Sequence, residues 1–372
     1  MRGTARPTAA GRPLAAALLR SAPVSGAART DRPPSLSVLI VSHNSAAELA
    51  RSLPAIVPEL RDGDELIVCD NGSADGSAAA VARLAPAATV IEAGANLGFA
   101  AGCNRAAERA RGDLLLLLNP DNVVAAGFRD AIELPLIEGR GWGAWQGLVT
   151  DRGGEILNSA GGVVHFTGIA WAGGAGRPRA EAPAAPREVA FPSGACLAIR
   201  REVWAELGGF SEPYFLYHED TDLGLRLRLA GHVAGIEPRA LSDHGYEFDK
   251  GAAKWRHLER NRWATIIRDY PGRLLAVVAP ALFATELALL PAAALGGWLP
   301  QKLAAYGDLA RALPRLLRER RAIGAARRID AAEFADACLT ADLDSAYLGA
   351  AGRSKPLRAL LRAYWRAARA LL

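Results

Sequence analysis

The stretch LLLLLNPDNVV, residues 114–124, joins five consecutive leucines to a short polar turn. A short, continuous apolar run is typical of a strand that is buried on both faces, as in a parallel sheet. The strand then ends at Asn119, Pro120, Asp121 and Asn122, which carry two amides and a carboxylate. We therefore expect a central buried strand that delivers polar side chains to one edge of a sheet.

Three earlier segments repeat this scheme. They are LSVLIVSHN (36–44), DELIVCDNGSADGS (64–77) and ATVIEAGANLGFAAGCNRAAERA (88–110). Alanine-rich helical patterns occupy 46–60, 77–85 and 99–110. Alternating strands and helices predict an α/β fold with a mainly parallel central sheet. In such sheets ligands bind beyond the carboxyl ends of the strands, so we expect the polar tips to meet at one edge.

The composition fits a folded, two-part chain. Of 372 residues, 51% are hydrophobic and 22% charged, which excludes wholesale disorder. The excess of positive charge behind the net charge of +5 lies in the C-terminal third of the chain. Residues 311–328 hold seven arginines and one acid, Glu319. Nucleic acid or an anionic membrane surface would each explain this excess. The four cysteines are scattered without metal-binding spacing, which indicates buried thiols in a reducing compartment.

The first 34 residues are rich in arginine, alanine and proline. The apolar run at 14–19 is too short for a convincing signal peptide. We expect a disordered leader at 1–34, with a transit peptide as the alternative.

A dinucleotide-binding fold would place GxGxxG between the first strand and the first helix. That turn reads SHNSAAEL and has no glycine, while the glycines of 94–102 are wrongly spaced and follow the third strand. The sequence therefore disfavours an NAD(P)-dependent oxidoreductase.

Taken in order, SVLIVSHNS, ELIVCDNGSADGS, NLGFAAGCNRA and LLLLNPDNVV resemble successive motifs of glycosyltransferase family 2. The resemblance covers about residues 35–270. It implies a GT-A domain there, followed by a helical region at 271–372. It also implies a nucleotide-sugar donor.

The resemblance assigns the donor site to the first three strand tips. The residues implied to bind the nucleotide, ribose and phosphates are Ser42, His43, Asn44, Asp70, Asn96 and Gly98. Asp70 would accept hydrogen bonds from the base, because a carboxylate and an N–H form a strong, orienting pair.

By the same resemblance, Asp121 would hold a divalent cation, Mg²⁺ or Mn²⁺, against the donor diphosphate, with Asn119 and His244 as further ligands. Hard cations prefer oxygen ligands and often take only one or two from the protein. The family usually reads DxD here. The Asn119-Pro120-Asp121 form resembles the rhamnosyltransferase-like branch, and the missing carboxylate leaves a catalytically inactive relative as an alternative.

The segment FLYHEDTDLGLRLRLAG (215–231) carries the family's ED motif. The resemblance implies that Asp220 is the base that deprotonates the acceptor hydroxyl, with Glu219 beside it. Asp222 and Arg226 are four residues apart on the expected helix and are predicted to pair. Lys254 and Arg260 would add positive charge near the diphosphate.

Residues 274–299 contain one charge, Glu286, in 26 positions. That length suffices for one membrane span, but a span would export the following arginines, against the positive-inside rule. We expect a re-entrant or in-plane segment with the arginines on anionic headgroups. A helical subdomain packed on the catalytic domain is the alternative. The final helix, with arginines opposite leucines and aromatics, has the same interfacial character.

These features predict an inverting, metal-dependent glycosyltransferase at the cytoplasmic face of a membrane. The first choice of donor is dTDP-rhamnose, with UDP-galactofuranose or a hexose as open alternatives. The acceptor would be a hydroxyl of a lipid-linked or cell-surface glycan. No nucleic-acid module is recognisable, and homo-oligomerisation stays open.

Overall fold

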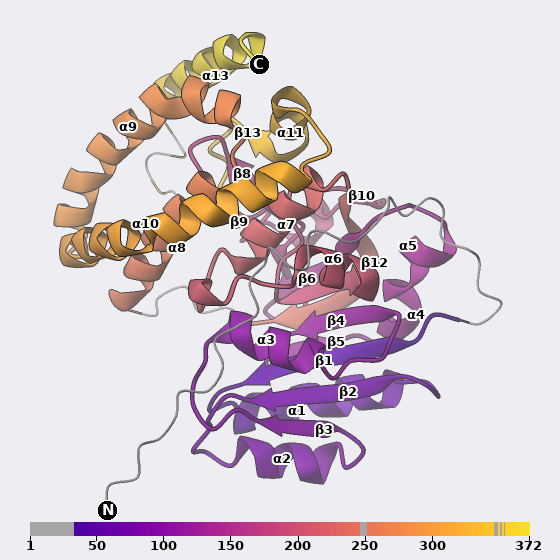
Figure 1. Ribbon diagram of the computed structural model, residues 1–372. Helices are drawn as coiled ribbons and strands as arrows, with labels where there is room; N and C mark the ends of the chain where they lie inside the picture. The colour runs from indigo at the N-terminus through magenta and orange to yellow at the C-terminus, as the bar shows by residue number, and fades with distance from the viewer. Residues whose placement is uncertain (1–32, 246–250, 346–348, 350–351, 353) are drawn as a thin grey trace, which may run out of the picture.

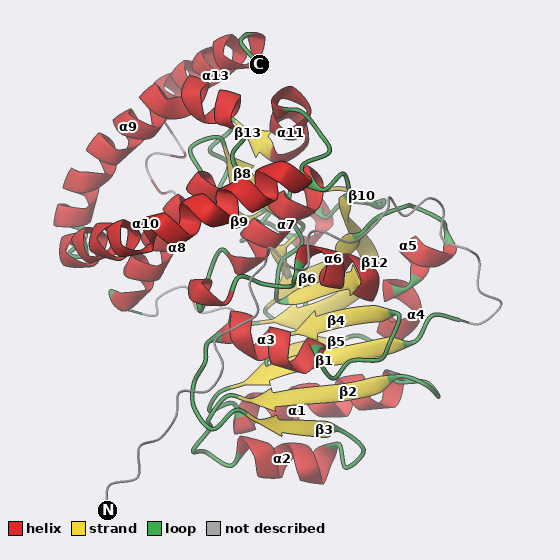
Figure 2. Ribbon diagram, viewed as in Figure 1, coloured by secondary structure: helices red, strands yellow, loops and turns green. Residues whose placement is uncertain are grey.

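The computed structural model describes residues 33–245, 251–345, 349, 352 and 354–372. Almost all of the leader expected at 1–34 lies outside these residues. The chain folds around one large mixed sheet, with helices on both faces and a group of long helices at one end (Figures 1 and 2).

The large sheet has the strand order β10-β12-β6-β11-β4-β1-β2-β3, with β5 and β7 attached to β12 and β6. Its strands are β1 (Leu36–Ser42), β2 (Glu65–Asp70), β3 (Thr89–Glu92), β4 (Leu114–Leu118), β5 (Asn122–Val124), β6 (Ala144–Asp151), β7 (Ile156–Ser159), β10 (Arg187–Glu188), β11 (Cys196–Arg200) and β12 (Ala234–His244). The expected parallel arrangement is confirmed for β3, β2, β1 and β4. Beyond β4 the sheet is mixed, because β11 runs antiparallel to both β4 and β6.

Strand β4 is leucine throughout because both faces of the sheet are covered. Leu114, Leu116 and Leu118 pack with α1 (Ala46–Ile56) and α2 (Ser77–Leu84) in one core. Leu115 and Leu117 point to the opposite face, where α3 (Phe99–Ala107) and α6 (Arg201–Leu207) complete a second core. Side chains alternate across a strand, so two covered faces require a continuous apolar run.

The other described helices before residue 271 are α-helices and short 3-10 helices. They are η2 (Val57–Glu59), α4 (Phe128–Ile132), α5 (Leu134–Ile137), η3 (Arg179–Glu181), η4 (Glu212–Tyr214), α7 (Glu219–Leu229) and α8 (Ala253–Asp269). A second, three-stranded sheet joins β8 (Gly162–His165), β9 (Ala170–Ala172) and β13 (Leu339–Thr340).

The predicted ion pair between Asp222 and Arg226 is present in α7, where Nε of Arg226 lies 2.8 Å from Oδ2 of Asp222.

Within the described residues after 271, the structure has the helices α9 (Gly272–Leu295), α10 (Leu299–Ala326), α11 (Ala331–Cys338) and α13 (Lys355–Ala370). They surround α8 and the second sheet (Figure 1). One hydrophobic core contains Phe166, Tyr270, Leu282 and Phe334, so it runs across the boundary predicted at residue 270. That boundary stays a prediction.

The final helix makes contacts within the protein, and its expected interfacial role stays a prediction. The apolar side of α13 packs on the protein, because Trp365 stacks on Phe166 with ring centroids 5.0 Å apart and planes at 3°. The hydroxyl of Tyr364 donates to the carbonyl of Val277 at 2.6 Å. The amphipathic pattern of α13 thus serves a protein contact with α9 and the second sheet.

Candidate functional site

Three side chains predicted to hold a metal lie together at the end of β4 and β12. Nε2 of His244 is 3.1 Å from Oδ1 of Asp121 and 3.1 Å from the side-chain nitrogen of Asn119. Strand pairing explains this, since β12 pairs with β5 and brings His244 opposite Asn122. The hydroxyl of Ser52, on α1, holds the turn by donating to the carbonyl of Pro120 at 2.6 Å.

This donor set fits a divalent cation that takes few protein ligands. A carboxylate oxygen, an amide oxygen and an imidazole nitrogen are ligands that Mn²⁺ or Mg²⁺ accepts, with phosphate and water completing the shell. The Asp121 side chain is 28% exposed and therefore reachable by a ligand. Within the described part of the chain, no cluster of three or more His, Cys, Asp or Glu side chains forms a metal site. A cation at this turn would therefore take the rest of its ligands from phosphate and water.

Asp220 lies at the start of α7, half-buried and hydrogen-bonded. Its Oδ2 accepts from the amide of Gly194 at 3.0 Å, and its Oδ1 accepts from the amide of Thr221 at 2.7 Å. Burial raises the pKa of Asp220, although the hydrogen bonds from Gly194 and Thr221 act against that rise. A carboxylate with a raised pKa is suited to accept a proton near neutral pH.

Glu219 occupies a different environment from its neighbour. It is buried, and its Oε2 has no hydrogen-bond partner among the described residues. Burial, and then the charge of Asp220, raise the pKa of Glu219 well above its usual range. The two neighbouring carboxyl groups therefore titrate as a pair, with Glu219 shifted toward its neutral form.

A two-residue segment, Gly194–Ala195, connects the two acidic centres. The Gly194 amide donates to Asp220. The neighbouring carbonyl of Ala195 accepts from the backbone of Asn119 at 3.2 Å and from the side chain of Asn122 at 2.7 Å. The turn that carries Asp121 and the carboxylate of Asp220 are thus bonded to two consecutive residues of the backbone.

The predicted base-binding residues sit side by side at that edge. Ser42 and Asp70 are the last residues of β1 and β2 and are partners in the parallel register. Oδ2 of Asp70 accepts from the amide of Ser73 at 3.2 Å. Oδ1 of Asp70 and Oγ of Ser42 are buried and have no partner among the described residues. Such orphaned polar atoms are unusual in folded proteins and fit a missing polar ligand.

His43 and Asn44 build the turn beside them. Nδ1 of His43 lies 3.0 Å from the carbonyl of Asn71, and Oδ1 of Asn44 accepts from the amide of Ala74 at 2.8 Å. Asn44 has a φ of 52°, a left-handed conformation that asparagine tolerates. Both residues are exposed and reachable by a ligand, but their present contacts shape the loop.

Asn96 and Gly98 are held by Asn71, a residue that the sequence reasoning missed. The side-chain amide of Asn71 donates to Oδ1 of Asn96 and to the carbonyl of Gly98, both at 3.1 Å. A Cβ on Gly98 would lie 2.4 Å from the ring of Phe215, so glycine is required by that contact. The signal for Asn71 was its place in the DNG turn directly after Asp70.

Lys254 and Arg260 lie in different places on α8. The ammonium of Lys254 is 5.3 Å from the ring centre of Tyr217, close to the segment before Asp220. Arg260 instead lines a cavity together with residues of α10, and its Nη2 donates to the carbonyl of Tyr214 at 2.8 Å. These contacts do not bring Arg260 to the Asn119–Asp121–His244 cluster.

Asn261 was also missed, although it fixes the chain that leads to the acids. Its side-chain amide donates to the carbonyls of Tyr214, Leu216 and Tyr217 at 3.0, 2.9 and 2.7 Å. Phe215, Tyr217 and His218 all have φ between 65° and 69°, which is strained for residues with a Cβ. An asparagine next to an arginine on a helix carries no local signal of this long-range role.

The profile of Glycosyl transferase family 2 matches residues 37–133. The N-acetylglucosaminyl-diphospho-decaprenol L-rhamnosyltransferase of Mycobacterium tuberculosis is 30% identical over 258 residues, which cover 62% of this chain and 83% of that enzyme. Among solved structures, GalNAc-T7 with UDP, GalNAc and Mn²⁺ superposes with a TM-score of 0.54. It is 16% identical, and the match covers 67% of this chain and 51% of that one. That likeness concerns the fold alone.

The three bonds of Asn261 predict a measurable contribution to stability. Asn261→Asp keeps the size of the side chain but removes the donors and faces a carboxylate toward three carbonyls. We expect it to lower the free energy of unfolding by about 2 kcal/mol or more, since each net hydrogen bond contributes about 1 kcal/mol. Urea denaturation followed by circular dichroism measures this, and Asn261→Ala separates bond loss from repulsion. A change within about 0.5 kcal/mol for both variants would contradict the clamp.

Proposed function

Because the chain belongs to glycosyltransferase family 2 and has the GT-A fold, we propose that it transfers a sugar from a nucleoside diphosphate to a hydroxyl of a lipid-linked glycan, with inversion. The chain is a glycosyltransferase, so neither the inactive relative nor the oxidoreductase is needed as an alternative. Rhamnose from dTDP-rhamnose is the proposed donor sugar, and a sugar on a prenyl diphosphate is the proposed acceptor. Both follow the mycobacterial relative's name and the NPD motif.

The observation that carries this proposal is the shared backbone segment between the two acids. Direct displacement with inversion needs a base on one side of the sugar and charge compensation for the leaving diphosphate on the other. Asp220 and the Asn119–Asp121 turn are bonded to Gly194 and Ala195, two consecutive residues. One sugar ring placed over this segment would meet both.

The nucleotide would occupy the carboxyl ends of β1 and β2. There the free acceptor of Asp70 and the hydroxyl of Ser42 offer buried hydrogen-bonding atoms to a base. A base N–H that donates to the carboxylate of Asp70 would form a charge-assisted bond that orients the nucleotide. His43 and Asn44 form the neighbouring wall, and Asn96 and Gly98 the far one.

When a divalent cation is bound, it offsets the charge that grows on the leaving diphosphate. The residues that would hold it are Asp121, Asn119 and His244, and His244 would exchange its contact with Asp121 for the cation. Asn158 steadies His244 by donating to its backbone carbonyl at 2.9 Å. Mn²⁺ is present in the structure of GalNAc-T7, which supports a divalent cation here.

The acceptor hydroxyl would lose its proton to Asp220. The hydrogen bonds from Gly194 and Thr221 aim both carboxylate oxygens and favour the ionised form. Burial and the charge of Asp220 raise the pKa of Glu219, which favours a neutral Glu219 beside an ionised Asp220.

Membrane association is the last part of the proposal. Among the described residues, one helix, α9, is long and apolar enough to cross a membrane by length and composition. Its outward side is largely uncovered, with Phe283 66% and Leu295 91% exposed. We place α9 in the plane of the inner leaflet, where a lipid-linked acceptor and a cytoplasmic donor would meet.

Replacing the carboxylate of the turn tests the metal site. Asp121→Ala should weaken Mn²⁺-dependent dTDP binding about ten-fold or more, because one of few protein ligands is lost. Thermal-shift titrations of dTDP with and without Mn²⁺ measure this, with NAD as a ligand that should give no shift. Asp62→Ala removes an exposed loop carboxylate and should change nothing. Equal Mn²⁺ dependence in wild type and Asp121→Ala would exclude this cation site.

The role of Asp220 predicts both a variant and a pH profile. Asp220→Asn should keep the fold and bind donor but lose turnover by about 100-fold or more. In wild type, kcat/KM should fall as the pH drops through a pKa above the usual aspartate range, because a protonated Asp220 takes no proton. In the Glu219→Gln variant, kcat/KM should still fall at low pH, because Asp220 is unchanged. Substantial turnover by Asp220→Asn would remove this residue from the mechanism.

The outward face of α9 predicts membrane binding. A Phe283→Asp, Leu287→Asp variant should bind phosphatidylglycerol vesicles about ten-fold or more weakly, because two apolar side chains lose their burial in lipid. Vesicle co-sedimentation measures this. Ile137→Asp alters an equally exposed apolar residue on α5 and serves as the matched control. If all three proteins sediment alike, α9 is not the contact.

A further inference from the structure

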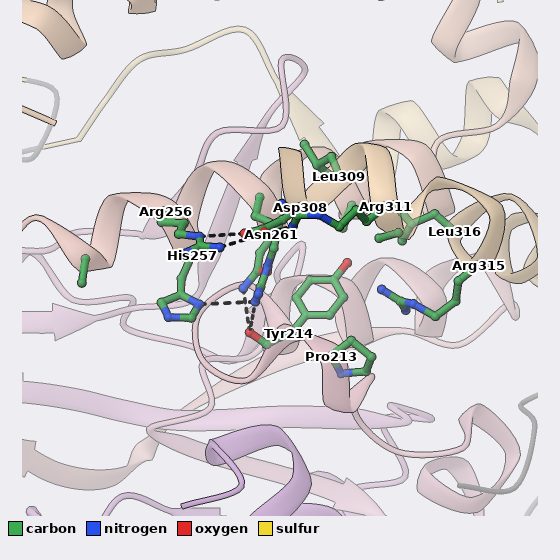
Figure 3. Close-up of a pocket in the computed structure, with 14 residues that line it drawn as sticks. Pro213, Tyr214, Arg256, His257, Asn261, Asp308, Leu309, Arg311, Arg315 and Leu316 are labelled. Atoms are coloured by element: carbon green, nitrogen blue, oxygen red, sulfur yellow. Dashed lines mark hydrogen bonds and ion pairs between the residues drawn. The ribbon is translucent and has the colours of Figure 1, made fainter. Parts of the chain in front are cut away.

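A cavity of about 510 Å³ lies between α8 and α10, and none of the residues that line it belongs to the Asn119–Asp121 turn (Figure 3). Its charged lining consists of Arg256 and Arg260 from α8, and Arg311, Arg315 and Asp308 from α10. Tyr214 forms part of its floor. The volume falls within the range of small-molecule sites. Neither the family motifs nor the donor site account for this cavity.

The lining carries more positive charge than its partners neutralise. Arg256 and Arg311 share Asp308, with nitrogen–oxygen distances of 2.7 and 2.8 Å. Arg315 pairs with Glu319 at 2.8 Å. The four guanidinium groups of the lining thus have two carboxylates nearby. Of these, Asp308 lines the cavity and Glu319 does not. A bound anion would supply the missing charge.

Arg260 is the least compensated of the four. Its guanidinium donates to the carbonyl of Tyr214 and to Oδ1 of Asn261, which are neutral acceptors. Within the described ranges, no carboxylate forms an ion pair with it. Burial lowers the pKa of Arg260, in keeping with a cation that lacks a direct counter-ion. A partly buried guanidinium of this kind binds phosphate oxygens well, because its planar fork matches them.

One wall of the cavity is apolar and continues onto an exposed stripe. Leu309 and Leu316 of α10 line the cavity. Leu313 and Leu317 lie one turn apart beside them and are 41% and 42% exposed. An anionic cavity ligand with an apolar tail would cover this stripe, whereas a free anion would leave it in water.

We propose that the cavity binds the diphosphate of a prenyl diphosphate ester, with the prenyl chain along Leu313 and Leu317. This rests on the proposed function, in which the acceptor sugar is carried on such a lipid. The cavity also touches the segment before the base, since Tyr214 is bonded by Arg260 and Asn261 and leads along the chain to Asp220. A diphosphate held there anchors the acceptor next to the residue that deprotonates it.

The test is calorimetric titration of the full chain with farnesyl diphosphate in EDTA, which keeps the donor cation site out of play. The double variant Arg256→Gln, Arg311→Gln should bind at least ten-fold more weakly. The matched control Arg318→Gln, Arg321→Gln removes two exposed charges of α10 outside the cavity and should bind like wild type. If the first variant fails to fold, Arg311→Gln alone, at a 76% exposed side chain, replaces it. Equal affinity of the folded cavity variant and wild type overturns the proposal.

Two further titrations identify the source of the anion. Inorganic pyrophosphate should bind more weakly than farnesyl diphosphate, and equal affinity would indicate a free-anion site and overturn the lipid assignment. Phosphatidylglycerol vesicles should still bind the cavity variant. Loss of vesicle binding with unchanged farnesyl diphosphate affinity would assign the arginines to bulk headgroups instead.

Donor binding separates this inference from the proposed function. The cavity variant should keep its Mn²⁺-dependent shift with dTDP, while Asp121→Ala should lose that shift and keep farnesyl diphosphate binding. If wild type binds farnesyl diphosphate but never dTDP or another nucleotide, the cavity stands and the proposed donor fails. If Asp121→Ala abolishes both, the diphosphate sits at the donor site and the cavity assignment is wrong.

Discussion

The site depends on the pairing of β4 with β11 inside a sheet that is covered on both faces. Cys196 lies opposite Leu118, so the backbone just before β11 must lie beside the polar turn that follows β4. Ala195 then accepts hydrogen bonds from that turn, and Gly194 donates to Asp220. The antiparallel register thereby converts two segments about 75 residues apart into one surface. A slip of one residue would turn the leucines to the wrong core and separate the acids.

The second acid depends on a segment that would not hold its shape alone. Phe215, Tyr217 and His218 lie close together in the chain and all have a positive φ. In isolation, each of these backbone conformations would cost about 1–3 kcal/mol. The amide of Asn261 and the guanidinium of Arg260 compensate by binding three carbonyls of this segment. Helix α8 is in turn packed along α10. Helix α10 therefore helps to hold the segment that precedes Asp220, although the family profile ends at residue 133.

Sequence alone predicted what depends on local pattern. The apolar runs identified β1, β2 and β4, and the resemblance placed Asn119, Asp121 and His244 in one cluster. It did not predict the clamps made by Asn71 and Asn261, because their partners are backbone carbonyls and amides distant in the chain. The contacts of α13 with Phe166 and Val277 were not predicted either. Periodicity gives the apolar face of a helix but not what that face meets.

Charge, more than hydrophobicity, sets the orientation of α9. Its single acid, Glu286, pairs with Arg262 of α8 and Lys302 of α10, and Lys302 is fully buried and also pairs with Glu259. Such a network is costly to break, because removing one member leaves a buried charge uncompensated. The Glu286 side of α9 must therefore face the protein. Only Leu274, Val278, Leu282 and Ala293 of this apolar helix are fully covered. The position of this one carboxylate therefore leaves much of the apolar surface of α9 outward.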